Sequence, residues 1–379
     1  MNPTAKEGSM MLNKTLLDLY TDYLVSSFSL VTATGLSELV NGQYSHDQIT
    51  RFLAQEEYSP KAYWRCIKPV LRQIEDDNAL LIIDDTIEEK PYTDENDIVC
   101  WHYDHTKSTN VKGMNLVNFL YQTTRETGQD VSLPVAYEVV SKTETVVDPK
   151  TQKTKRKSPI SKNERVRQRL TILRFHNQIR FKYVVFDSWF ASKENLTFIR
   201  HTLKKHVVCA LKGNRTMALS EQDQLAGKFV QVSVLDIPPQ TTCLVYLKGI
   251  DFPVVFTKQH FTNKDGSHGV LYLVSSDTAL TYDQLTNIYQ RRWHVEEFHK
   301  SLKQNAALEK SPTRTTTTQK NHIFAAMLAF LKLEMLKFTT TLNHFALKHR
   351  LYLKAISTCF KELRMLKHAH QVLNFNISA

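Results

Sequence analysis

The sequence predicts an α/β protein with a helical region ahead of its sheet and a β-rich block inside it. Two short apolar runs, Ala79–Ile83 and Tyr183–Phe186, have the length and the polar flanks of buried strands. Helical periodicity comes before the first run, and short β-like runs separated by turn signals fill residues 207–274. With 379 residues, the chain has room for about two or three domains.

Residues 12–78 have the pattern of a helical region. Apolar residues recur at helical spacing from Leu16 onward, and Ser45 followed by Gln48 has the form of a capping box. Ser59-Pro60 supplies a second helix start. Two short helices with a polar link fit a helix-turn-helix that reads DNA. They also fit a plain helical subdomain, which the sequence favours slightly, and both interpretations stay open.

Beyond residue 79 the pattern alternates between strands and helices. Residues 79–140 predict a meander of three strands, and residues 142–182 are rich in Lys and Arg. The first half of that basic stretch predicts an exposed loop and the second half a helix. Its single sign of charge favours a surface that follows DNA phosphates over an ordinary solvated face. Further helices are predicted over 193–205, 283–304 and 317–368.

Four segments follow from this pattern. We expect an N-terminal helical DNA-binding domain over residues 1–78, the first part of the core over 79–206 and a β-rich insertion over 207–280. The second part of the core, with an acid-bearing helix and the C-terminal helices, would take residues 281–379.

Composition limits the partners and the compartment. The chain has 49 Lys and Arg against 38 Asp and Glu, a net charge of +11 that favours a polyanion, nucleic acid before a membrane surface. The five cysteines form no C-x-x-C pair, which argues against a disulfide framework and a cysteine zinc site. No apolar run approaches the ~20 residues of a spanning helix. We therefore expect an intracellular protein that makes no use of a membrane.

Two acids stand where the apolar strands end. Asp84, with Asp85 directly after it, ends the first run, and Asp187 ends the second. Carboxylates at strand ends are suitable ligands for hard divalent cations such as Mg²⁺. Two such ions can activate a nucleophile and stabilise the leaving oxygen in phosphoryl transfer. Strand-end aspartates are also common in turns, so these acids alone are weak evidence.

A third acid comes from the helix predicted over 283–304. At ~100° per residue, one arc of about 80° holds an acid, a tyrosine and three cations. These residues are Tyr289, Arg292, Glu296, Lys300 and Lys303. A carboxylate among cations suits a metal-bound phosphodiester. The same stripe would also suit a solvated face with ion pairs four residues apart.

The spacing of these residues resembles a known family. Tyr289, Arg292, Glu296 and Lys303 match the Y-R-E-K signature of the IS4-type DDE transposases, and the string from Tyr289 to Lys300 looks like its Tn5 branch. Asp84 or Asp85 and Asp187 stand where the family has its first two acids. The resemblance covers residues from about 79 to 335. It implies an RNase H-like core, a mixed sheet flanked by helices, with an inserted β-rich domain.

The resemblance also implies roles for single residues. Asp187, Glu296 and either Asp84 or Asp85 would be the catalytic metal ligands. Asp84 is favoured because Thr86 then takes the hydroxyl position, but the sequence does not separate the two. The implied cofactor is Mg²⁺, two ions per site, with Mn²⁺ as a substitute. The implied DNA contacts are Tyr289, Arg292, Trp293, Lys300 and Lys303, and Trp293 could instead be a packing indole.

The implied function is that of a DDE transposase of an insertion sequence. It would bind terminal inverted repeats, cleave DNA with the help of metal ions and join the freed end to target DNA. Double-stranded DNA, as transposon ends and target, would be its partner, and a homodimer would form the synaptic complex. The expected location is the cytoplasm of a prokaryote, in association with the nucleoid. Two alternatives remain: an RNase H-like nuclease without strand transfer, and an inactive DNA-binding protein derived from a transposase.

Overall fold

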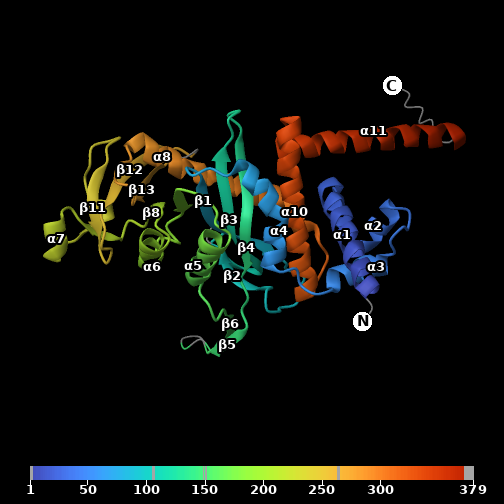
Figure 1. Cartoon of the computed structure of the whole chain (residues 1–379), viewed down its shortest axis with the longest axis horizontal. Coiled ribbons are helices and arrows are strands. Elements are labelled where there is room, and N and C mark those ends of the chain that lie inside the picture. Colours follow the sequence, from blue (N-terminus) through green and yellow to red (C-terminus); the bar gives the residue numbers. More distant parts are fainter. Residues whose placement is uncertain (1–2, 105–106, 148, 150–151, 263–264, 371–379) are drawn as a thin grey trace, which may run out of the picture. The chain divides into compact units, whose positions relative to one another are not determined.

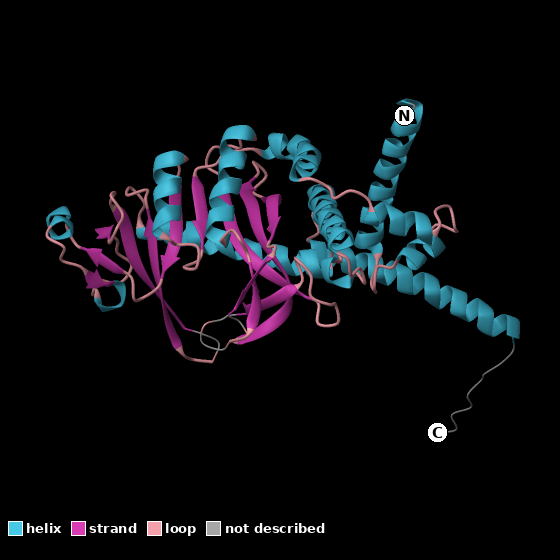
Figure 2. Ribbon diagram, turned by 90° about the horizontal axis from the view of Figure 1, so that it is seen from below, coloured by secondary structure: helices cyan, strands magenta, loops and turns pink. Residues whose placement is uncertain are grey.

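The computed structural model describes residues 3–104, 107–147, 149, 152–262 and 265–370 (Figures 1 and 2). The chain forms two compact units. The first, which we call the helical unit, comprises Met1–Glu56, Lys300–Thr313 and Thr317–Ala379. The second, the sheet unit, comprises Glu57–His299 and Arg314–Thr316.

The sheet unit contains the described strands and about half of the helices. Its strands are β1 (Leu80–Glu89), β2 (Cys100–Asp104), β3 (Thr109–Thr124), β4 (Asp130–Val139), β5 (Glu144–Val147), β6 (Thr154–Lys157), β7 (Tyr183–Phe186), β8 (His206–Leu211), β9 (Thr216–Ala218), β10 (Val230–Gln231), β11 (Cys243–Leu247), β12 (Val254–Thr262) and β13 (His268–Ser275). Its helices are α4 (Pro60–Ile74), α5 (Lys162–Thr171), α6 (Lys193–Thr197), α7 (Glu221–Leu225), α8 (Tyr282–Gln290) and the first part of α9 (His294–Gln304).

A mixed sheet forms the centre of this unit. β1 pairs antiparallel with β3 and parallel with β7, and β7 pairs parallel with β8. β3 also pairs antiparallel with β2 and β4. The apolar residues Leu80–Ile83 are completely or almost completely buried, as expected for a strand covered on both faces. The three strands predicted over residues 79–140 and the α/β class are therefore confirmed, and β2 is a further strand in this range that was not predicted.

Helices cover both faces of the sheet. Neighbouring residues of a strand point to opposite faces. His299 of α9 lies 3.0 Å from Asn118, whose strand partner is Asp84. Lys162 of α5 instead lies 2.7 Å from Asp85, on the other face. Helices α9 and α5 therefore flank the sheet from opposite sides, as the predicted RNase H-like arrangement requires.

The β-rich block continues the same sheet. β8 pairs antiparallel with β13, and the order then runs through β12, β11, β9 and β10. The first of the predicted runs in this block is β8 itself, next to β7. A separate inserted domain over residues 207–280 stays a prediction, as do the other three predicted segments.

Three local expectations were wrong. The basic loop expected before residue 161 contains β6, which pairs with β5 in a separate two-stranded sheet. The helix expected over 283–304 is interrupted by a 3-10 turn at Arg291–Trp293. The helix expected over 317–368 is two helices, α10 (Thr316–Thr340) and α11 (His344–His370), with Thr341 at a φ of 56° between them. The two helix breaks were missed because neither a 3-10 turn nor a left-handed residue changes the spacing of apolar residues.

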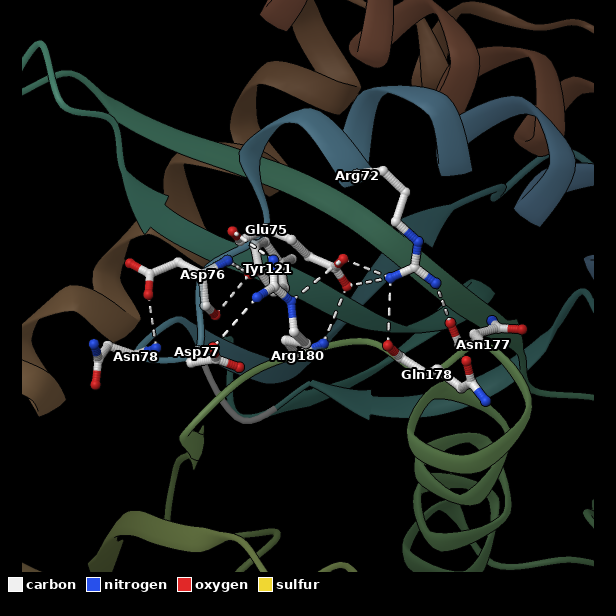
Figure 3. Close-up of polar contacts among 9 residues, drawn as sticks. All are labelled: Arg72, Glu75, Asp76, Asp77, Asn78, Tyr121, Asn177, Gln178 and Arg180. Atoms are coloured by element: carbon white, nitrogen blue, oxygen red, sulfur yellow. Dashed lines mark hydrogen bonds and ion pairs between the residues drawn. The ribbon is translucent and has the colours of Figure 1, made fainter.

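A polar cluster holds the starts of β1 and β7 beside each other (Figure 3). Arg72, near the end of α4, pairs with Glu75 and donates to the carbonyl of Asn177 at 2.6 Å. The guanidinium of Arg180 also lies near Glu75. Tyr121 of β3 accepts from the amide of Asp76 at 2.8 Å. These contacts join α4, β3 and the segment before β7, so the parallel strands begin at a fixed register.

The helical unit is built around α10. It also contains α1 (Pro3–Ser26), α2 (Ala33–Leu39), α3 (His46–Ala54) and α11. Tyr20 of α1 hydrogen-bonds His322 of α10 at 2.9 Å, and Asn321 donates to the carbonyl of Leu53 at 3.0 Å. The predicted capping box of Ser45 and Gln48 is confirmed at the start of α3. Helix α4, the second helix of the suggested helix-turn-helix, falls in the sheet unit, where Tyr63 donates to the carbonyl of Pro134.

Candidate active site

The register of the parallel strands β1 and β7 places Asp84 and Asp187 next to each other at the carboxyl ends of their apolar runs. Ile83 of β1 pairs with Phe186 of β7. Asp84 and Asp187 are the next residues on their strands, so both carboxylates start from the same edge of the core. Asp187 is oriented by backbone amides, because its Oδ1 accepts from Trp189 at 2.9 Å and from the buried Phe190 at 3.4 Å.

Asp84 lies in a buried, charged environment. Its Oδ2 accepts from Nη1 of Arg292 at 2.8 Å, and its Oδ1 accepts from the amide of Asp85 at 2.9 Å. The pKa of Asp84 is raised to about 7: burial is the main cause, Arg292 opposes it, and the charges of Asp187 and Glu296 add to it. The three acids are therefore close enough to act on one another electrostatically.

Helices α8 and α9, with the 3-10 turn between them, supply the remaining groups. Nη1 of Arg292 lies 3.7 Å from Oε1 of Glu296, and its guanidinium carbon lies 5.7 Å from the ring centroid of Tyr289. Tyr289 is only 8% exposed, and burial raises its pKa to about 12. The stripe expected from the sequence is therefore not a solvated face at Tyr289 and Arg292.

Asp85 has different partners from Asp84. Its Oδ2 accepts from Asn115 at 2.6 Å and from Lys162 at 2.7 Å, on the opposite face of β1. The structure thus brings Asp84 together with Asp187 and Glu296, and it keeps the side chain of Asp85 away from them. The assignment of Asp84 as the metal ligand remains a prediction that this geometry favours.

The sequence matches two models of known protein families. The sequence model described as DDE superfamily endonuclease matches residues 12–227, and the one described as transposase DDE domain matches residues 136–331. Each match covers more than half of the chain. The chain belongs to the DDE superfamily. A search of curated proteins found no match. The matches support a transposase-type nuclease that acts on DNA.

The remaining predicted site residues of this DDE protein lie in two places. Trp293 is 64% exposed and lines a cavity of about 940 Å³ together with Phe261, Leu271 and Arg291. Lys300 and Lys303 belong to the helical unit, where Nζ of Lys300 lies 5.0 Å from the ring of Phe345. The exposure of Trp293 argues against a purely packing indole.

DDE enzymes use divalent metals, so the carboxylates of Asp84, Asp187 and Glu296 should be able to bind a cation. Among the described residues, no group of three or more His, Cys, Asp or Glu side chains is spaced to hold a metal ion. The guanidinium of Arg292 contacts Asp84 and approaches Glu296 instead. The oxygen donors and their mutual repulsion are what a hard cation needs. The residues fit such an ion in chemistry, provided that Arg292 gives up its contact with Asp84.

Sequence reasoning missed two groups that support the acids. Asn118 donates to the buried His299 at 3.0 Å, which ties the acid-bearing helix to the strand beside Asp84. Lys162 contacts Asp85 from α5. The members of each pair are 181 and 77 residues apart, so no local pattern could have revealed them.

The basic stretch of residues 142–182 is partly used inside the protein. Arg169 pairs with Glu138, and Lys182 with Asp277. Such pairs reduce the charge that this stretch offers to DNA. In the described part of the chain, no helix is long and apolar enough to cross a membrane.

Proposed function

We propose that this DDE protein is the transposase of an IS4-type insertion sequence. It would bind the terminal inverted repeats, cleave at the ends and transfer the freed strand to target DNA. The observation that carries this proposal is the group of Asp84, Asp187 and Glu296 around Arg292, on one face of the sheet. The spacing of Tyr289, Arg292, Glu296 and Lys303 supports the IS4-type assignment.

The carboxylates of Asp84, Asp187 and Glu296 would hold two Mg²⁺ ions, with Mn²⁺ able to substitute. When bound, such ions activate the attacking oxygen and stabilise the leaving oxygen of a phosphodiester. The amides of Asp85 and Trp189 hold Asp84 and Asp187 in place. Once released from Asp84, the guanidinium of Arg292 is free to bind a phosphate oxygen in a charge-assisted pair. Tyr289 packs beside it and would hold the guanidinium near the acids.

We assign the cavity beside Trp293 to DNA, with Lys300 and Lys303 as further contacts. The cavity joins an exposed indole and apolar side chains to Arg291 and Arg292. Aromatic faces and guanidinium groups together suit nucleotides, which present a flat base and a charged phosphate.

Trp293→Ala is expected to weaken binding to the element's ends by about 10-fold, because one base–aromatic contact contributes about 1–3 kcal/mol. Fluorescence anisotropy with a labelled end duplex measures this. Trp101→Ala, at an indole of β2 that is 53% exposed and lies outside this cavity, is the matched control. Equal affinities for Trp293→Ala and the parent would remove Trp293 from the DNA contacts.

We further propose that the protein acts as a homodimer, because synapsis brings two ends together. Helix α11 supports this: every described residue from Tyr352 to Lys367 is exposed. Its exposed apolar residues include Tyr352, Ile356, Phe360 and Leu363. They lie within one arc of the helix at ~100° per residue. Most of the stability of a helix in a protein comes from packing its apolar face, and a second copy would cover the apolar arc of α11.

A double change, Ile356→Asp with Leu363→Asp, is expected to convert the dimer to monomer, because two charges would enter the apolar contact. Analytical ultracentrifugation with end DNA measures this. Lys354→Asp with Lys361→Asp, on the opposite side of α11, is the control. A parent protein that stays monomeric with DNA contradicts the dimer, and a dimer that survives the first change contradicts the role of α11.

The proposed function is tested by cleavage of a labelled duplex that carries the element's own ends, in Mg²⁺ and in EDTA. We expect nicking at the end in Mg²⁺ and none in EDTA. Glu296→Ala should lose cleavage but keep end binding, and the exposed Glu221→Ala of α7 should keep both. Binding without cleavage by the parent would leave an inactive end-binding protein. Cleavage without joining of a pre-cut end would leave a nuclease without strand transfer.

A further inference from the structure

Lys162 contacts residues in or next to both acid-bearing strands from one face of the sheet. It is the first residue of α5, on the face of the sheet opposite α9. Its Nζ lies 2.7 Å from Oδ2 of Asp85, next to the end of the buried part of β1. The same Nζ lies 4.7 Å from the ring centroid of Trp189, just beyond β7. One ammonium group therefore contacts a residue beside each of the first two acids.

The two residues that Lys162 contacts also orient the acids. The amide of Asp85 donates to Oδ1 of Asp84 at 2.9 Å. The amide of Trp189 donates to Oδ1 of Asp187 at the same distance. The side chains of Asp85 and Trp189 thus bind Lys162, while their backbone amides bind the catalytic carboxylates.

Helix α5 holds Lys162 firmly. Ser161 caps the helix by accepting from the amide of Glu164 at 3.1 Å, and Val166 and Leu170 are fully buried. A second link runs through the buried Asn195. Its Nδ2 lies 2.8 Å from Oδ1 of Asn163 and 2.9 Å from the carbonyl oxygen of Phe190. The start of α5 and the segment after Asp187 are therefore joined twice.

We propose that Lys162 is a positioning residue that sets the spacing of Asp84 and Asp187 for the cleavage reaction. It touches neither acid and acts through Asp85 and Trp189. This inference rests on the proposed function, because it concerns the same active site. The physical reason is that the salt bridge and the cation–π contact share one charge, so neither strand end can shift without losing a favourable contact.

The decisive experiment compares Lys162→Met with Lys162→Arg. Methionine keeps the length of the side chain but removes both charged contacts, and arginine can still pair with Asp85 and stack on Trp189. Groups that orient ligands typically change metal affinity or activity by about 10-fold to 100-fold. We expect Lys162→Met to lower the single-turnover cleavage rate and the affinity for Mn²⁺, measured without DNA, within that range. Binding of the end duplex should stay within about 2-fold of the parent, and Lys162→Arg should recover most of both losses.

Arg169→Met is the matched control. Arg169 lies on the same helix and pairs with Glu138 of β4, so its loss breaks a comparable contact between α5 and the sheet. It should lower thermal stability without a change in Mn²⁺ affinity. A double-mutant cycle of Lys162→Met and Asp85→Asn adds a second readout, because the effects on cleavage should be less than additive if the two residues act as a pair.

The outcomes separate this inference from the proposed function. Normal cleavage and Mn²⁺ affinity in Lys162→Met would overturn the positioning role and leave the transposase intact. The positioning role is also overturned if Arg169→Met has equal effects, or if Lys162→Met and Asp85→Asn add independently. A parent protein that neither cleaves end DNA nor binds Mn²⁺ would instead overturn both.

Discussion

Replacing Asp84 with asparagine is expected to reduce DNA cleavage by at least about 10³-fold, the scale found when a group at the reacting centre is removed. The same change at Asp85 should cost only about 10-fold to 100-fold, because we propose that Asp85 orients Asp84 without touching the reacting atoms. The reason is the alternation of side chains along β1. Asp84 faces Arg292 and the other acids, whereas Asp85 faces Lys162.

Single-turnover cleavage of end duplexes in Mg²⁺ measures both effects, with end affinity measured in parallel. Asp94→Asn, in the exposed segment between β1 and β2, is the control. If Asp85→Asn lost as much activity as Asp84→Asn, the two faces of β1 would have to exchange roles in the active enzyme. Asp84 would then be the supporting residue.

Removing the guanidinium of Arg292 is expected to destabilise the protein by about 3 kcal/mol in EDTA, the lower end of the range for breaking a buried ion pair. The side chains of Arg292 and Asp84 are only 15% and 13% exposed, so water replaces their contact poorly. Arg292→Met would leave Asp84, Asp187 and Glu296 to repel one another. Because the same acids would hold the cations, we expect the loss to be clearly smaller in Mg²⁺.

Urea unfolding of the parent and Arg292→Met, with EDTA and with Mg²⁺, measures this difference. Arg156→Met is the control, because Arg156 pairs with the exposed Asp97 and should give a small loss that Mg²⁺ does not change. A loss in Arg292→Met that is equal in both buffers would show that the acids and the cations do not share a site.

The sequence determined the features that depend on neighbouring residues. The apolar runs before Asp84 and Asp187 specify buried strands, because a strand covered on both faces cannot alternate. The family signature around Glu296 needed only the spacing along one segment, and the capping box of α3 needed only four residues. From these features the α/β class, the mixed sheet and the three acids could all be predicted.

The tertiary structure alone decided how these residues meet. The contact of Arg292 with Asp84 joins residues 208 positions apart, and the packing of helices on the two faces of β1 decides that Asp84 and not Asp85 receives it. Tyr289 is buried near the end of α8, and the 3-10 turn at Arg291–Trp293 separates it from Glu296, which an ideal helical wheel does not show. The sequence could not predict the contacts of Lys162, because its partners Asp85 and Trp189 come together only when α5 packs on the sheet. Local patterns encode which elements form, but long-range packing fixes which side chains touch.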